Sequence, residues 1–108
     1  MSKTARLAKP SAVIVDIDGT LVIVSGLSEL AREDTELWLT RHLGVPFEGP
    51  FMRPARDDRK DEAIMREIYD HEIAPRFDVL CVLNDRDQVV RMWRALGLVC
   101  LQVAPGDF

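Results

Sequence analysis

Cysteine is scarce in this sequence. Cys81 and Cys100 are the only two among 108 residues, and they lie in separate apolar runs without CxxC spacing. Two cysteines in a domain of this hydrophobicity are too few for the disulfide framework of a small secreted protein. We therefore expect buried, reduced thiols, and the sequence leaves open a disulfide between neighbouring strands.

Long apolar runs are missing as well. No stretch of the chain approaches the roughly 20 apolar residues that a membrane-spanning helix requires. The first nine residues are basic, but they reach Pro10 without a long apolar segment or a clear cleavage site. They do not resemble a signal peptide. We expect a cytoplasmic protein without a membrane partner.

Neither sign of charge dominates. The chain has 14 Lys and Arg against 18 Asp and Glu, and its net charge of -4 provides no global attraction to nucleic acid. Basic residues nevertheless cluster in segments 53–66 and 86–94, so the sequence is compatible with a local basic patch on the surface. The length of 108 residues fits one domain. We expect residues 1–11 to form a disordered basic lead and residues 12–108 to form the folded domain.

Strand and helix patterns alternate along the folded part. Apolar runs, most of them rich in β-branched residues, predict strands at residues 12–16, 21–25, 79–83 and 98–103, with a shorter extended piece at 47–53. Helical patterns fill the stretches that follow Gly26, Asp57 and Asp85. Leu30 and Leu37 are expected on the buried side of the first of these helices, and Trp38 and Trp93 are expected in the core. This alternation predicts an α/β fold, a mostly parallel sheet with helices on both faces. In such sheets ligands bind at the carboxyl ends of the strands.

The run Asp16-Ile17-Asp18-Gly19-Thr20 follows the first predicted strand. Of two carboxylates with this spacing, one can attack a phosphorus atom while the other transfers a proton, and both can lie beside a divalent cation. An aspartyl-phosphate is an established form of covalent catalysis, and Mg²⁺ suits a site of carboxylates, carbonyl oxygens and phosphate. The alternative interpretation is that Asp-Gly is only a turn and that Asp16 merely ends the strand.

Other candidate residues lie near predicted strand ends or helix starts. The hydroxyl of Ser25 and the backbone amides from Gly26 onward can hold phosphate oxygens, and Lys60 can neutralise developing charge. Asp85, after Asn84, can complete a metal site. Each has a structural alternative: Ser25 and Asp85 are good helix caps, and Lys60 is a typical solvated lysine of a first helical turn.

The order of these motifs resembles the haloacid-dehalogenase-like superfamily. Within it, the chain is most similar to the 3'-phosphatase domain of phage-type polynucleotide kinase-phosphatases. The resemblance covers the DxDGT run and nearly all residues from 22 onward. Characteristic pieces are Ser25-Gly26 and segments 32–35, 38–39, 59–61, 73–79 and 85–86, and the most specific are 88–94 and 102–108.

The resemblance implies a role for each candidate. Asp16 is then the nucleophile and a Mg²⁺ ligand, and Asp18 is the acid-base that also offers its carbonyl to the metal. Ser25, Gly26 and Lys60 hold the substrate phosphate, and Asp85 lies near the metal. The implied reaction is the Mg²⁺-dependent removal of a 3'-phosphate from a DNA or RNA end during repair. No GxxxxGK[ST] motif occurs, so no kinase activity is expected.

Three departures from the family pattern are visible. Leu27 stands where the family has an arginine, and Asn84 stands where it has the first acid of a pair. The family also carries several tens of residues between the DxDGT run and the Ser-Gly strand, whereas Thr20 is followed directly by Leu21. These departures favour a second hypothesis, a weak or inactive phosphatase-like domain that binds nucleic acid or associates with itself.

The missing segment affects the first two strands most. Parallel neighbours need a crossover of about a dozen residues, and only residues 17–20 separate these two runs. Three arrangements fit: a hairpin that places Ser25 at the end of the sheet away from Asp16, a domain-swapped homodimer, or two segments that are separated by a further stretch in the full protein. The missing helix would also leave one sheet face uncovered and favour association.

Overall fold

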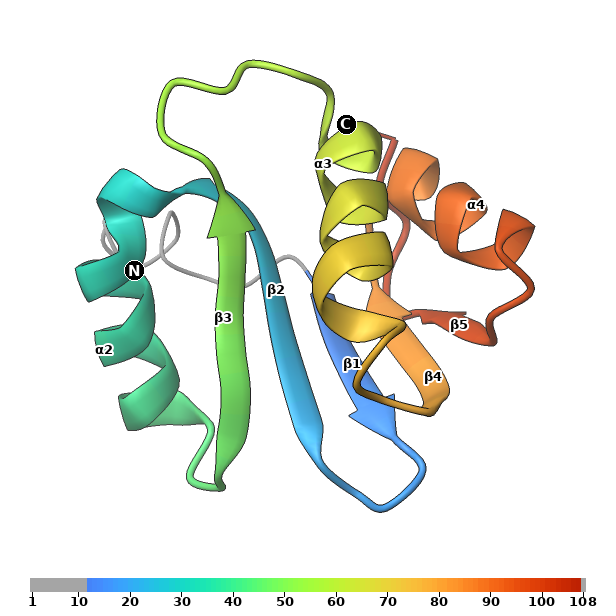
Figure 1. The fold of residues 1–108 in the computed structure, drawn as a ribbon, viewed down its shortest axis with the longest axis horizontal. Helices are drawn as coiled ribbons and strands as arrows, with labels where there is room; N and C mark the ends of the chain where they lie inside the picture. The colour runs from blue at the N-terminus through green and yellow to red at the C-terminus, as the bar shows by residue number, and fades with distance from the viewer. Residues whose placement is uncertain (1–11, 108) are drawn as a thin grey trace.

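The computed structural model of this protein describes residues 12–107, so the predicted basic lead lies outside the described residues. Five strands form one sheet in the order β3-β2-β1-β4-β5 (Figure 1). The strands are β1 (Ala12–Asp16), β2 (Leu21–Ser28), β3 (Phe47–Arg53), β4 (Val79–Asn84) and β5 (Cys100–Gln102). The helices are η1 (Glu29–Ala31), α2 (Arg32–His42), α3 (Asp61–Ile68), the π-helical η2 (Tyr69–Ile73) and α4 (Asp87–Ala95).

The central strand β1 runs against the other four strands of the described sheet. It pairs antiparallel with both β2 and β4, whereas β2 pairs parallel with β3 and β4 pairs parallel with β5. Ala12 at its start lies opposite Val24 on one side and Asn84 on the other. The predicted α/β fold with a mostly parallel sheet is confirmed. Of the three arrangements that the sequence allows, the structure has the hairpin.

One face of the sheet carries the main core. Helices α3 and α4 pack on this face (Figure 1), and their apolar side chains meet alternate residues of β1, β2 and β4. Trp93 of α4 is fully buried, as expected of a core tryptophan, and lies edge-on to Tyr69 at 6.0 Å between ring centroids. The buried cluster consists of Ala12, Ile14, Val22, Val24, Ile64, Met65, Ile68, Ile73, Val82, Val89, Val90, Trp93 and Cys100.

Among residues 12–107, the elements that pack on the other face cover only part of its width. Strand alternation places Ile23 on this side, where it is fully buried, and α2 beside β3 contributes the fully buried Leu39. Farther across the sheet, Val13 and Leu83 are only half-buried, and Leu101 is 53% exposed. This fits the expectation that the shortened chain leaves one sheet face uncovered. Homodimerisation through that face stays a prediction.

Several local predictions were wrong. β2 continues through Gly26 to Ser28, whose side chain accepts a hydrogen bond from the backbone N–H of Leu30 at the start of η1. Leu30 and Leu37, expected on a buried helix side, are 80% and 51% exposed. Trp38 is half-buried rather than core, because it stacks on the exposed His42 at 4.4 Å.

Both cysteines are free thiols, as expected, and Cys100 is buried, but Cys81 is only half-buried rather than buried. Within residues 12–107, no helix is long and apolar enough to cross a membrane.

Candidate functional site

The DxDGT run forms the turn between β1 and β2. Asp16 is 7% exposed, and its Oδ1 accepts hydrogen bonds from the backbone N–H groups of Ile17 at 2.6 Å and Asp78 at 3.1 Å. The backbone N–H of Asp16 donates to the carbonyl of Thr20 at 2.9 Å. Gly19 adopts φ +95°, a left-handed conformation that glycine allows at little cost. The carboxylate of Asp16 therefore closes the hairpin and fixes the start of β4.

Asp18 lies at the exposed tip of the same turn. Its Oδ1 accepts a hydrogen bond from the backbone N–H of Thr20 at 2.9 Å, and this bond is the main reason why the pKa of Asp18 is lowered. Asp18 also lines a cavity of about 620 Å³ between the turn and the segment 45–48. The predicted acid-base residue therefore faces open space at this end of the sheet.

Ser25 and Gly26 lie at the opposite end of the sheet, near the end of β2. Ser25 is fully buried, and its Oγ accepts a hydrogen bond from the backbone N–H of Leu27 at 3.1 Å. Gly26 touches the carboxylate of Asp61: a Cβ added to Gly26 would come within 3.0 Å of Oδ1. A larger residue at this position would therefore have to displace the Asp61 carboxylate slightly. That carboxylate occupies the space next to the predicted phosphate cradle.

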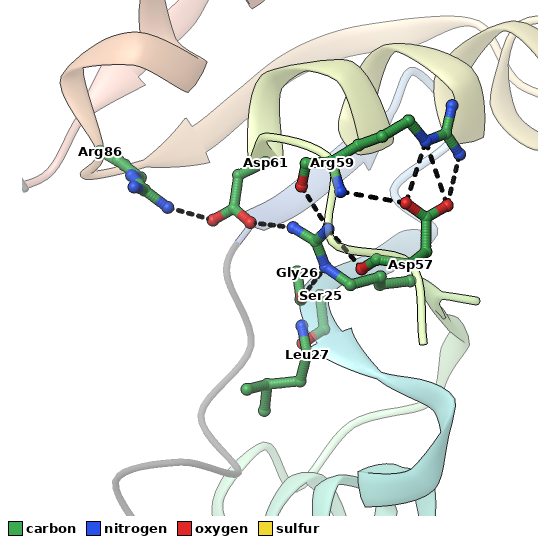
Figure 2. A network of polar contacts seen from close by, with 8 residues as sticks. Ser25, Gly26, Leu27, Asp57, Arg59, Asp61 and Arg86 are labelled. Carbon is green, nitrogen blue, oxygen red and sulfur yellow. Dashed lines mark hydrogen bonds and ion pairs between the residues drawn. The ribbon is translucent and has the colours of Figure 1, made fainter. Parts of the chain in front are cut away.

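Asp61, the first residue of α3, is shared by two arginines. Its Oδ1 accepts from Nη2 of Arg53 at the end of β3, and its Oδ2 accepts from Nη1 of Arg86 just before α4. Figure 2 shows Asp61 between Arg86 and the turn of Ser25 and Gly26. The side chains of this network are 12%, 21% and 30% exposed for Arg53, Asp61 and Arg86. The three residues join β3, α3 and α4 at this end of the sheet.

Arg53 also organises the loop before α3. Its Nε donates to the carbonyl of Gly26 at 2.8 Å, and its Nη1 donates to the carbonyls of Asp57 at 2.9 Å and of Arg59. The Arg59 side chain forms ion pairs with Asp57 at 2.6 Å and Glu67 at 2.5 Å (Figure 2 shows the former). Arg53 and Arg59, two members of the basic cluster at 53–66, thus hold the loop itself, and Arg56 of the same cluster is exposed.

Lys60 precedes this network directly. It is the exposed N-cap residue of α3, and its carbonyl accepts hydrogen bonds from the backbone N–H groups of Ala63 at 3.0 Å and Ile64 at 3.2 Å. The structure therefore brings Lys60 to the same end of the sheet as Ser25 and Gly26. Its role in holding phosphate stays a prediction.

Asn84 and Asp85 follow β4 at this end. Asn84 is 3% exposed, its Oδ1 accepts from the backbone N–H of Arg86 at 3.2 Å, and its Nδ2 has no acceptor among the described residues. Asp85 is not the N-cap of α4. That position is taken by Arg86 in an extended conformation, and its side chain makes no capping hydrogen bond.

The structure divides the predicted site between the two ends of the sheet. Because β1 is reversed, Asp16 lies four residues beyond Ala12, which is level with Asn84. At a rise of about 3.4 Å per residue, the separation along the strand is roughly 14 Å. Asp16 and Asp18 thus lie at one end, and Ser25, Gly26, Lys60 and Asp85 lie at the other.

The predicted Mg²⁺ ligands do not fit one ion in this arrangement. Asp85 lies at the end of the sheet away from Asp16 and Asp18. The residues that the structure describes also contain no group of three or more His, Cys, Asp or Glu side chains able to hold a metal ion. Coordination of one Mg²⁺ by all three residues requires β1 to leave its antiparallel position, so that Asp16 and Asp18 lie at the same end of the sheet as Asp85.

Comparison with known proteins decides the family. The family model described as "Polynucleotide kinase PNKP phosphatase domain" matches residues 21–108. The chain belongs to the PNKP phosphatase family. The match begins at the first residue of β2, so the fold of β2 to β5 is the part that carries the PNKP phosphatase likeness.

Named relatives agree with this assignment. The chain is 32% identical over 81 residues to a putative bifunctional polynucleotide kinase/RNA ligase of Autographa californica nuclear polyhedrosis virus, and this match covers 75% of the chain and 12% of that protein. Two solved structures of the Pnkp1/Rnl/Hen1 RNA repair complex match with a TM-score of 0.76 and 40% identity. The two matches cover 81% of this chain, and they cover 28% and 30% of the matched chains. The chain thus spans a minor part of each relative.

Sequence reasoning missed the roles of Asp61, Arg53 and Arg86. The sequence placed Asp61 and Arg86 in characteristic segments and Arg53 and Arg86 in basic clusters, without a contact between them. The available signal was their position, because each lies at the boundary of an element on the carboxyl side of the sheet. Their pairing depends on the tertiary structure, because 25 positions separate Asp61 from Arg86.

Proposed function

We propose that this chain recognises a phosphorylated nucleic-acid end and that, with β1 as a hairpin strand, it does not hydrolyse the phosphate through Asp16. The observation that carries this proposal is the separation of Asp16 from Ser25 and Lys60 within a PNKP phosphatase fold. A nucleophile must approach within about 3.5 Å of the atom that it attacks. A phosphate held beside Ser25 is out of its reach.

A second function is favoured by the intact DxDGT run and by the family match. It is Mg²⁺-dependent hydrolysis of a 3'-phosphate through an aspartyl-phosphate on Asp16, with Asp18 as acid-base. In this reaction Ser25, Gly26 and Lys60 bind the phosphate oxygens. This function requires β1 to leave its antiparallel position, so that its carboxyl end meets that of β2.

One experiment separates the two functions. Phosphate release from 3'-phosphorylated DNA and RNA oligonucleotides is measured with saturating Mg²⁺, alongside binding of the same oligonucleotides. We expect binding with release no faster in the wild type than in Asp16→Asn. Release by the wild type that Asp16→Asn abolishes would instead establish the phosphatase. Failure to bind either oligonucleotide would contradict the proposal.

A further inference from the structure

The segment between β3 and α3 carries an arginine that does not take part in holding the loop. In Figure 1 this segment, residues 54–60, extends beyond the carboxyl end of β3 before the chain enters α3. Arg56 is exposed, and its side chain makes no hydrogen bond or ion pair with the described residues. We propose that Arg56 contacts the sugar-phosphate backbone of a nucleic-acid strand whose phosphorylated end lies beside Ser25 and Lys60.

The charge of this segment favours an anion. Of the three basic residues in 54–60, Arg59 forms ion pairs with acids, whereas Arg56 and Lys60 form none with the described residues. Asp58 is the acid that opposes them. The groups without an ion pair therefore carry one net positive charge, in a chain whose net charge is -4. This local charge attracts a phosphodiester backbone, although the chain as a whole does not.

The backbone of Arg56 has a conformation that arginine rarely adopts. Its φ is +63°, and the backbone N–H of Asp57 donates to the carbonyl of Pro54 at 3.2 Å, so Arg56 is the third residue of a hydrogen-bonded turn. Glycine or asparagine is favoured there when φ is positive, because a Cβ is strained in this conformation. No hydrogen bond or ion pair of the Arg56 side chain with the described residues offsets the strain. A strained residue of this kind is typical of a binding site.

The turn that carries Arg56 is held in place by its neighbours. Nη1 of Arg53 donates to the carbonyl of Asp57 at 2.9 Å, and the backbone N–H of Arg59 donates to Oδ1 of Asp57 at 3.1 Å. Nε of Arg53 donates to the carbonyl of Gly26 at 2.8 Å, so one guanidinium joins the turn to the end of β2. The Arg56 side chain therefore extends from a fixed base, next to the residues proposed to hold the terminal phosphate.

The contact proposed for Arg56 is distinct from the site of the terminal phosphate. Ser25 is fully buried, whereas Arg56 is exposed on the projecting segment, so a strand that ends at Ser25 can pass Arg56 with an internal phosphate. Such a contact positions the strand without reading its sequence, and it requires a ligand longer than one nucleotide. The inference rests on the proposed function, because it assumes that a nucleic-acid end is bound. It adds the direction in which the strand leaves the site.

The test is a fluorescence anisotropy titration of the full chain with 5'-labelled, 3'-phosphorylated DNA and RNA octamers at several salt concentrations. A 3'-phosphorylated mononucleotide is measured as a competitor. Arg56→Gln should weaken octamer binding about threefold to fivefold, as expected for an exposed ion pair, and should reduce the salt dependence by about one phosphate contact. The affinity of the mononucleotide should stay unchanged, because it has no internal phosphate that could reach Arg56.

Arg56→Gly adds a readout that a structural arginine would not give. Glycine relieves the strain at φ +63°, so the urea midpoint of this variant should rise while its octamer affinity falls to that of Arg56→Gln. A lower midpoint would contradict the inference, because Arg56 would then support the fold. The matched control is Arg41→Gln, which removes an exposed arginine from the last turn of α2 and should change neither quantity.

The outcomes distinguish this inference from the proposed function. Octamer affinity that is equal in the wild type and both Arg56 variants would overturn the inference and leave the proposed function standing. Equal weakening of octamer and mononucleotide would also overturn it, because Arg56 would then hold the terminal phosphate. If the wild type binds neither octamer, the proposed function fails, and the inference fails with it.

Discussion

Asp16 Oδ1 accepts a hydrogen bond from the backbone N–H of Asp78 at 3.1 Å. The two residues are 62 positions apart, and this bond sets the end of β1 beside the start of β4. In a parallel arrangement the same carboxylate would lie beside the end of β4. The predicted nucleophile therefore has a structural role in the hairpin as described.

Substitutions of Asp16 should separate its structural role from its chemical one. Asp16→Asn keeps Oδ1 as an acceptor for Ile17 and Asp78, so the free energy of unfolding should change by less than about 1 kcal/mol. Asp16→Ala removes the acceptor of the Asp78 N–H, whereas the Ile17 N–H still donates to the Asp78 carbonyl at 2.8 Å, and the loss should cost roughly 1–3 kcal/mol. Urea unfolding measures both variants. Equal losses would show that the charge of Asp16, rather than its acceptor oxygen, stabilises the turn.

Arg53→Ala should be among the more damaging single substitutions at the carboxyl end of the sheet. It removes the donor to Asp61 and to the carbonyls of Gly26, Asp57 and Arg59. Hydrogen bonds to charged groups contribute about 1.5–3 kcal/mol, so we expect a loss of about 2–3 kcal/mol in urea unfolding.

The control for Arg53 is Arg76, an arginine whose side chain is much more exposed. Arg76 pairs with Glu48 at 3.7 Å, with both side chains about half exposed, so Arg76→Ala should cost less than about 1 kcal/mol. A loss for Arg53→Ala no greater than that for Arg76→Ala would contradict the role given to Arg53.

Gly26→Ala tests the packing of the Asp61 carboxylate on the end of β2. The new Cβ would lie 3.0 Å from Oδ1 and should destabilise the fold by about 1 kcal/mol or more. In an Asp61→Ala background the carboxylate is gone, so the same change should cost less. A double-mutant cycle measures this difference. Strict additivity of the two substitutions would show that the contact carries no energy.

Acid stability should report on Asp57. The Arg59 side chain, which forms hydrogen bonds with Asp57, lowers the pKa of that carboxyl from 3.8 to about 2. A lowered folded-state pKa contributes stability above the unfolded value and loses it as the pH falls. The stability difference between the wild type and Asp57→Asn should therefore be constant above about pH 5 and shrink between about pH 4 and pH 2. Unfolding curves across this range measure it, and a difference that is constant down to pH 2 would contradict the pairing.

The two thiols should differ in reactivity. Burial raises the pKa of Cys100, whereas Cys81 is half-buried on the less covered face. Because the thiolate is the reactive form, a thiol reagent at pH 7.5 should modify Cys81 first. Mass spectrometry of partly alkylated protein, with Cys81→Ser as control, checks the order. Faster labelling of Cys100 would indicate that the main core opens readily.

Much of the fold was predictable because it depends on local patterns. The apolar runs that became β1, β2 and β4 were found from their side chains alone, and Trp93 was expected in the core. Leu30 and Leu37 were misplaced because the apolar content of a segment does not show which side of a helix a neighbour covers. The start of α4 was misjudged because Asp85 fits the N-cap rule, yet the chain is still extended at Arg86.

The candidate site was predictable in its residues and not in its assembly. The DxDGT run and the Ser25-Gly26 pair are visible as motifs, and the four residues between the first two strands already allowed a hairpin. The pairing of Asp61 with Arg53 and Arg86 had no sequence signal, because it depends on where three element ends meet.

The sequence by itself determined the elements, the family pattern and the presence of two carboxylates after the first strand. Only the tertiary structure decided the direction of β1, and with it the separation of Asp16 from Ser25. The physical reason is chain length. Residues 17–20 are enough for a turn and too few for a crossover, so β1 enters the sheet reversed and its last carboxylate lies at the far end.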